Sequence, residues 1–185
     1  MTTYIAFLRG INVGGKRLIK MEDLRRVFES MGLKNVRTFI ASGNVLFETS
    51  QTNRAALTTK IEKKLLTAFA HDVPVVLQTI DELKDILKVG PFKKTKPSAD
   101  AMMCVTLLVA EPKAGPKLPL KSAIENLEVL AIKNRAAFIL CRRKKNGSFS
   151  FPNNFFEKEF GVTATTRQWN TIVRIVDFAD SAKGR

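Results

Sequence analysis

The chain has few of the residues on which metal sites and nucleophilic sites depend. It contains one histidine, His71, and two cysteines, Cys104 and Cys141, which lack CxxC spacing. A lone histidine cannot assemble a multi-histidine metal site, and no HExxH or GxSxG motif is present. The acidic residues fall on expected helix surfaces and form no isolated pair suited to acid–base catalysis. We therefore expect neither a metal nor a cofactor, and nothing in the sequence points positively to catalysis.

Long apolar runs are also missing. No run approaches the roughly 20 residues that a helix needs to span a bilayer. Residues 1–4 lack the basic start and apolar centre of a signal peptide. Both cysteines lie in apolar, strand-like segments, which is typical of buried free thiols in a reducing compartment. We expect a cytoplasmic protein without membrane contact.

Acidic residues are scarce relative to basic ones. Lysine and arginine number 31 against 17 aspartates and glutamates, which gives a net charge of +14. An excess of this size attracts phosphate-rich partners through long-range fields. The expected partner is therefore a nucleic acid or a phosphorylated small molecule. The apolar fraction of 45% over 185 residues indicates a folded chain of one domain or two small ones.

Apolar periodicity in the first half predicts strands alternating with helices. The expected strands are residues 4–8, 36–40, 45–47 and 73–77, and the expected helices begin near residues 21, 57 and 80. The resulting order is β-α-β-β-α-β followed by a helix, which is the order of a ferredoxin-like plait.

The same order begins again after an expected linker at residues 90–100. The expected elements are strands at 102–109, 129–132, 136–141 and 162–165, a weak helix at 120–127, and a short helix that starts near Asn154. We predict an α+β fold of the α/β plait type, with two tandem ferredoxin-like units at residues 1–89 and 101–185. Because the strands are apolar on both faces, the halves should pack together or the chain should form a homodimer.

The glycine-rich segment at residues 9–16 is the first candidate site. It reads Arg-Gly-Ile-Asn-Val-Gly-Gly-Lys and lies between an expected strand and an expected helix. It therefore concentrates main-chain N–H groups and positive charge where an anion can bind. The spacing nearly matches a P-loop, but Arg17 stands in place of the magnesium-binding Ser or Thr, which excludes a magnesium-dependent nucleotide hydrolase. The alternative is a structural turn whose glycines relieve backbone crowding.

The segment Thr-Thr-Arg-Gln-Trp-Asn-Thr at residues 165–171 is the second candidate. Thr165 and Gln168 have capping-box spacing, which predicts that the last helix starts there. Arg167 would then lie at a helix N-terminus, where the dipole and the guanidinium both favour an anion. The alternative makes Trp169 a core residue and Arg167 a surface charge.

Together these segments resemble a bacterial family, that of domain of unknown function 1697. The resemblance rests on residues 9–16, Ile19, Met21, Leu24, Arg25, the hairpin at residues 42–45, and residues 165–171, and it spans nearly the whole chain. The family has asparagine after the lysine and before the tryptophan, where this chain has Arg17 and Gln168. The resemblance implies a plait-based α/β fold with no established activity.

These segments supply the candidate ligand-binding residues, which are Arg9, Asn12, Gly14, Gly15, Lys16, Ser42, Gly43, Asn44, Thr166, Arg167, Trp169 and Asn170. We expect the loop after the first strand and the hairpin at residues 41–44 to lie at opposite ends of the sheet. A site that joins Arg9 and Lys16 to Arg167 would then have to form between the halves.

Three functional hypotheses follow. The leading one is a binding protein for an anionic ligand. The alternative is a small cofactor-free enzyme for a phosphorylated metabolite, in which Lys16 and Arg167 hold the phosphate and Asn12, Ser42 and Asn44 orient the substrate. The third is that these segments only determine the fold. A further basic tract at residues 142–145, with Lys93, Lys94 and Lys96, is either a phosphate-binding surface or a solvated hairpin tip.

Overall fold

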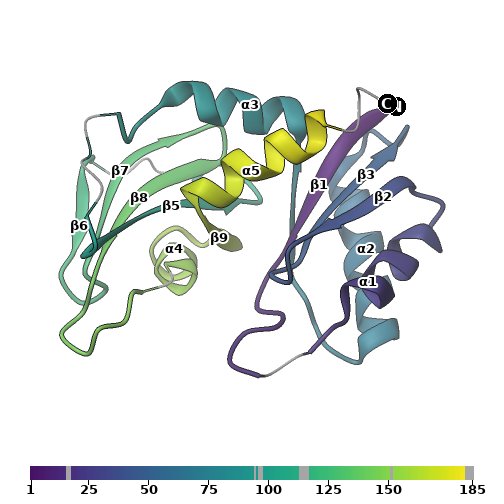
Figure 1. Cartoon of the computed structure of the whole chain (residues 1–185), viewed down its shortest axis with the longest axis horizontal. Coiled ribbons are helices and arrows are strands. Elements are labelled where there is room, and N and C mark those ends of the chain that lie inside the picture. The colour runs from purple at the N-terminus through teal and green to yellow at the C-terminus, as the bar shows by residue number, and fades with distance from the viewer. Residues whose placement is uncertain (16–17, 94, 96–97, 113–116, 151, 182–185) are drawn as a thin grey trace. The chain divides into compact units, whose positions relative to one another are not determined.

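A computed structural model gives the structure of the chain and describes residues 1–15, 18–93, 95, 98–112, 117–150 and 152–181 (Figure 1). The chain divides into two compact units. Unit 1 comprises Met1–Asp81 and the described residues from Phe178 onward, and unit 2 comprises Glu82–Asp177. The boundary passes through α3 (Ile80–Val89) and α5 (Trp169–Asp180). Within the ranges given, no helix has both the length and the apolar character required to cross a membrane.

Unit 1 contains a four-stranded antiparallel sheet in the order β2-β3-β1-β4. The strands are β1 (Thr2–Leu8), β2 (Lys34–Phe39), β3 (Asn44–Thr49) and β4 (Val75–Thr79). The helices α1 (Met21–Glu29) and α2 (Arg54–Phe69) lie on the same face of this sheet (Figure 1). The element order is the one predicted from apolar periodicity.

The helices of unit 1 form because their apolar residues recur at helical spacing. Leu57, Ile61 and Leu65 of α2 are fully buried, and burial of each such side chain contributes about 1.5–3 kcal/mol. The side chain of Asn53 caps α2 by accepting a 3.0 Å hydrogen bond from the Ala56 amide. Phe28 of α1 is also fully buried. The predicted stripes of both helices therefore form one core against the sheet.

Unit 2 contains a five-stranded antiparallel sheet in the order β6-β7-β8-β5-β9. The strands are β5 (Ala101–Leu108), β6 (Leu120–Ser122), β7 (Leu127–Lys133), β8 (Ala136–Arg142) and β9 (Ala164–Gln168). The helix α4 (Asn153–Phe160) contributes Phe156 to the core on one face. Cys104 and Cys141 belong to the same core and are free thiols, as predicted.

Several predicted elements of the second half were wrong. Residues 120–127 were expected to be helical, but 120–122 form β6, 123–126 form a turn and Leu127 begins β7, because β6 pairs with β7. The capping start expected from Asn154 does not occur, since α4 begins at Asn153 after Pro152 with no side-chain cap. The capping box expected at Thr165 is also absent: Thr165 lies in β9 and pairs with Leu107 of β5, and α5 begins only at Trp169. At residues 120–122 and 164–168, pairing with a neighbouring strand prevailed over the local helix signals.

Candidate functional site

The glycine-rich loop connects β1 to α1 and exposes its tip. Val13 is 63% exposed, and Gly14 and Gly15 have positive φ angles of 59° and 72°. A Cβ atom added at either glycine would have nothing within 4 Å. The main chain of the tip is therefore accessible to a ligand. Lys16, predicted to contact an anion here, lies outside the described residues.

Asn12 holds this loop in place through its amide group. Its Oδ1 atom accepts a 2.8 Å hydrogen bond from the Ile19 amide, and its Nδ2 atom donates to the Ile19 carbonyl at 3.0 Å. The same Nδ2 atom donates at 2.8 Å to the carbonyl of Ala41 in the β2–β3 hairpin. Asn12 itself has a positive φ angle of 55°, a conformation that asparagine tolerates better than most residues. The amide thus fastens both ends of the loop and joins the loop to the hairpin.

Gly43 lets the hairpin approach the loop closely. It has a φ angle of 77°, and a Cβ atom here would lie 2.6 Å from Ile11 Cδ1 and 2.9 Å from Leu8 Cβ. Its carbonyl accepts a 2.8 Å hydrogen bond from the Leu8 amide. A residue with a side chain cannot fit without displacing Ile11 or Leu8.

Asn44 and Ser42 stabilise the hairpin from within. The side chain of Asn44 is fully buried, and its Nδ2 atom donates to the Phe39 carbonyl and to Ser42 Oγ, each at 3.0 Å. Ile40 at the turn has a φ angle of 50°, which is strained for a β-branched residue. Ile40 is nevertheless 42% exposed, so the strained turn also presents an apolar side chain to solvent.

The loop and the hairpin lie at the same end of the sheet, so the expectation that they occupy opposite ends was wrong. β1 and β2 both pair antiparallel to β3, so β1 and β2 run in the same direction. Their C-terminal ends, from which the loop and the hairpin emerge, therefore coincide. Seven of the predicted site residues meet here, namely Arg9, Asn12, Gly14, Gly15, Ser42, Gly43 and Asn44. No second unit is needed to bring them together.

Thr166 lies in unit 2 and belongs to a buried chain of hydrogen bonds. Its Oγ1 atom donates to Asn153 Oδ1 at 2.7 Å and lies 2.8 Å from Thr106 Oγ1. Because a hydroxyl carries one proton, Thr106 must be the donor to Thr166. These hydrogen bonds connect β5 and β9 to the start of α4. The hydroxyl group of Thr166, which was predicted to face a ligand, is therefore bonded within unit 2.

Arg167 occupies a strand and not the helix N-terminus that was predicted. Arg167 lies in β9 and pairs with Val105 of β5. Its Nη1 atom donates to Thr165 Oγ1 at 3.0 Å and to the Thr166 carbonyl at 2.9 Å. Burial lowers the pKa of Arg167 to about 10, so the guanidinium remains charged at neutral pH. The alternative that made Arg167 a surface charge does not describe this half-buried side chain either.

Trp169 begins α5 and belongs to an aromatic cluster. Its ring lies 5.2 Å from Phe92 and 6.2 Å from Phe138 between centroids, both in edge-on geometry. Trp169 also lines a shallow cavity of about 220 Å³ with the exposed residue Asn170. The other residues that line this cavity are Ala101, Met102, Met103, Phe149 and Gln168.

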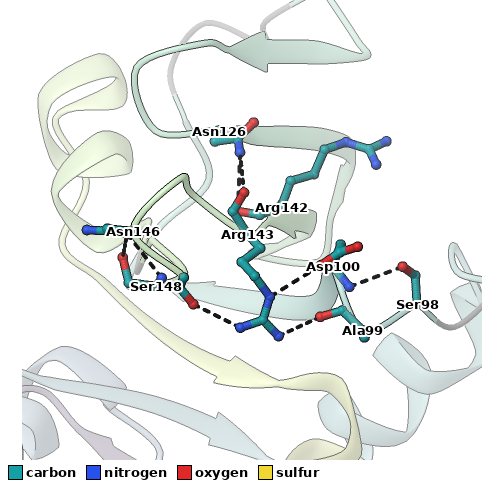
Figure 2. Close-up of polar contacts among 9 residues, drawn as sticks. Ser98, Ala99, Asp100, Asn126, Arg142, Arg143, Asn146 and Ser148 are labelled. Atoms are coloured by element: carbon teal, nitrogen blue, oxygen red, sulfur yellow. Dashed lines mark hydrogen bonds and ion pairs between the residues drawn. The ribbon is translucent and has the colours of Figure 1, made fainter.

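Three of the four basic residues at 142–145 have acidic partners, of which Figure 2 shows Asp100 beside Arg143. Arg143 lies 3.4 Å from Asp100 and also donates to the carbonyls of Ala99 and Gly147. Lys144 lies 3.5 Å from Glu125, and Arg142 lies 3.9 Å from Glu128. Of the lysines predicted to join this tract, Lys94 and Lys96 lie outside the described residues.

A second basic surface, which the sequence reasoning missed, lies between α1 and α2. A groove of about 370 Å³ is lined by Ser30, Met31, Lys60, Lys63, Lys64 and Thr67, and we call it the lysine groove. The spacing of the three lysines along α2 is visible in the sequence, beside the apolar stripe that predicted the helix. Elsewhere in the described chain, no cluster of three histidine, cysteine or acidic side chains is placed to hold a metal ion.

Comparisons with known proteins bear on fold and family. A family model described as "Protein of unknown function (DUF1697)" matches residues 1–138, so residues 165–171 lie beyond the match. The solved structure of conserved bacterial protein SP0830 from Streptococcus pneumoniae is similar, with 21% sequence identity and a TM-score of 0.66 over 96% of this chain and 98% of that one. At this identity the likeness shows the fold alone. No curated protein matches the chain.

Proposed function

The chain belongs to the DUF1697 family of proteins of unknown function, and we propose that it binds an anionic ligand at the exposed tip of its glycine-rich loop. The ligand is a nucleic acid or a phosphorylated small molecule. The observation that carries the proposal is an open tip held in a fixed shape by the three hydrogen bonds of Asn12. A preformed loop loses little conformational entropy when a ligand binds.

The residues of this site take two different roles. Asn12, Ser42, Gly43 and Asn44 position the loop, because their polar atoms and backbone are engaged in bonds within unit 1. The N–H groups of Gly14 and Gly15, with the charges of Arg9 and Lys16, contact the anion. Val13 and Ile40, both exposed, offer apolar cover for the rest of the ligand.

We do not assign Thr166, Arg167, Trp169 or Asn170 to this site. The first three have contacts within unit 2 that account for their side chains, namely the Thr106–Asn153 chain, the Thr165 hydroxyl and the Phe92–Phe138 cluster. Asn170 lines only the shallow cavity beside Trp169. The anion site therefore draws on unit 1 alone.

The test is to fill the open tip with one methyl group and to match, in a control, the backbone strain that a side chain incurs at a positive φ. Gly14→Ala adds a methyl group where an anion would approach the main chain, and we expect a loss of at least about tenfold in affinity for pyrophosphate by calorimetry. Gly147→Ala is the matched control, because Gly147 also has a positive φ (81°) and nothing within 4 Å of its Cβ position. Equal affinity of wild type and Gly14→Ala would contradict the proposal.

Arg9→Ala and Lys16→Ala separate a binding protein from an enzyme. A uniform loss of affinity for all polyanions, with a shallower salt dependence, supports a binding surface. Selective loss of one phosphorylated metabolite favours the alternative, a small cofactor-free enzyme. A lower melting temperature with no change in binding would leave the loop as a fold determinant only.

We also infer how the chain is organised and where it acts. The orders β2-β3-β1-β4 and β7-β8-β5-β9 support two tandem ferredoxin-like halves at residues 1–89 and 101–185, with β6 in place of one helix. The hydrogen bond that the Cys104 thiol donates to Cys141 raises the pKa of Cys104, and burial raises it further. Two free, buried thiols support a reducing compartment, the cytoplasm. A homodimer remains part of the proposal, to be tested by light scattering.

A further inference from the structure

We propose that the lysine groove is a second binding site, for the phosphate backbone of double-stranded nucleic acid. It lies at the C-terminal end of α1, about 13 Å of helix away from the glycine-rich loop at the N-terminal end. The proposal goes beyond the function proposed above, because the two sites share no residue.

The charges on α2 are segregated around the helix. Lys60, Lys63 and Lys64 line the groove, whereas Glu62 faces away from it and accepts a 2.9 Å hydrogen bond from the Val75 amide. The described residues that line the groove include no aspartate or glutamate. The groove therefore keeps its charge, in contrast to the offset tract at residues 142–145.

Two of the three lysines are available for a ligand. Lys60 Nζ donates at 3.1 Å to the Met31 carbonyl, just beyond the end of α1, and so balances the negative end of that helix. The helix end carries only about half an elementary charge, so the groove retains a positive excess from Lys63 and Lys64. Lys63 and Lys64 are both exposed to solvent where they line the groove.

The composition of the groove favours a duplex over a single strand. Single-stranded nucleic acids bind by stacking their bases on aromatic side chains. The residues that line this groove are lysine, serine, threonine and methionine, with no aromatic ring among them. Ammonium groups alone recognise phosphates without reading sequence, so the site should bind duplexes of any sequence.

The experiment measures anisotropy of a labelled 20-base-pair DNA of mixed sequence between 50 and 200 mM salt. For Lys63→Ala/Lys64→Ala we expect about tenfold weaker binding at the lowest salt and a log–log salt slope shallower by about two. Lys121→Ala/Lys144→Ala removes the same charge from two lysines that face carboxylates and should change affinity less than about twofold. The unfolding midpoint of the groove variant should not move, because both lysines are exposed.

Several results would overturn the proposal. Equal losses in the two double variants would mean that net charge alone governs binding. Undetectable binding by the wild type at 50 mM salt would also refute it. A third contrary result is full competition by poly-glutamate at equal charge, which would indicate an acidic protein as the partner. If the alanine variant is destabilised, Lys63→Gln/Lys64→Gln gives the same test with longer polar side chains.

Discussion

Asn12 should be the polar side chain on which the shape of the glycine-rich loop most depends. Asn12→Ala removes three hydrogen bonds and leaves the Ile19 amide and two carbonyls to be satisfied by water. We expect the free energy of unfolding to fall by about 1–3 kcal/mol in urea denaturation. Asn170→Ala, at an exposed position, is the control and should stay within about 0.5 kcal/mol of wild type. An unchanged free energy of unfolding in Asn12→Ala would contradict the role of Asn12 in holding the loop.

Gly43 should tolerate no side chain, for two separable reasons. Gly43→Ala incurs the strain of a positive φ, about 1–2 kcal/mol, and also forces its methyl group into Ile11 and Leu8. Gly32→Ala, also in unit 1, has a φ of 79° with nothing within 4 Å, so it measures the strain alone. The difference between the two variants gives the cost of the contact. Adding Ile11→Val to Gly43→Ala removes the nearest atom and should restore part of the loss.

Glu62 connects α2 to the start of β4 and makes the stability of unit 1 depend on pH. Burial is the main reason that its pKa is raised, with repulsion from Asp72 adding to it and the Val75 amide opposing it. A raised carboxyl pKa favours the folded state at low pH and penalises it once the group ionises. Glu62→Gln keeps an oxygen acceptor for Val75. It should therefore be more stable than wild type at pH 7 and equal to it below pH 4, as measured by urea denaturation across pH.

Local sequence signals predicted the elements of the first half better than those of the second. The apolar residues of α1 and α2 recur at helical spacing and are buried against one sheet, so the local pattern and the tertiary packing favour the same helices. Thr165 and Gln168 have equally good capping spacing, yet they form β9 because β5 offers a strand edge with which to pair. Such pairing joins residues about 60 positions apart, as Thr106 and Thr166 do, and is invisible in a local window.

The residues of the candidate site stay a prediction from the sequence, whereas the arrangement predicted for the loop and the hairpin was wrong. Arg9, Asn12, Ser42 and Asn44 were named from sequence, and the structure places them at one end of the unit 1 sheet. β2 runs in the same direction as β1, and the hairpin that follows β2 therefore lies next to the loop that follows β1. Thr166 shows the converse error, since a polar residue in a motif can serve a buried network instead of a ligand.

For the whole chain, the charge of +14 matters less than where it remains unpaired. Much of the positive charge on unit 2 faces nearby carboxylates, as at Arg142, Arg143 and Lys144. The lysine groove on α2 has no such partner among the described residues. A uniform field would make every basic residue equally important for binding, whereas our proposal expects the lysines of the groove on unit 1 to matter most.

The most direct measurement is anisotropy of labelled single- and double-stranded oligonucleotides with the unmodified chain, from 50 to 200 mM salt. The account predicts binding to the duplex with log affinity that falls linearly in log salt, the slope giving the number of phosphate contacts. No binding of either oligonucleotide at 50 mM salt would contradict the assignment of a phosphate-binding surface to unit 1.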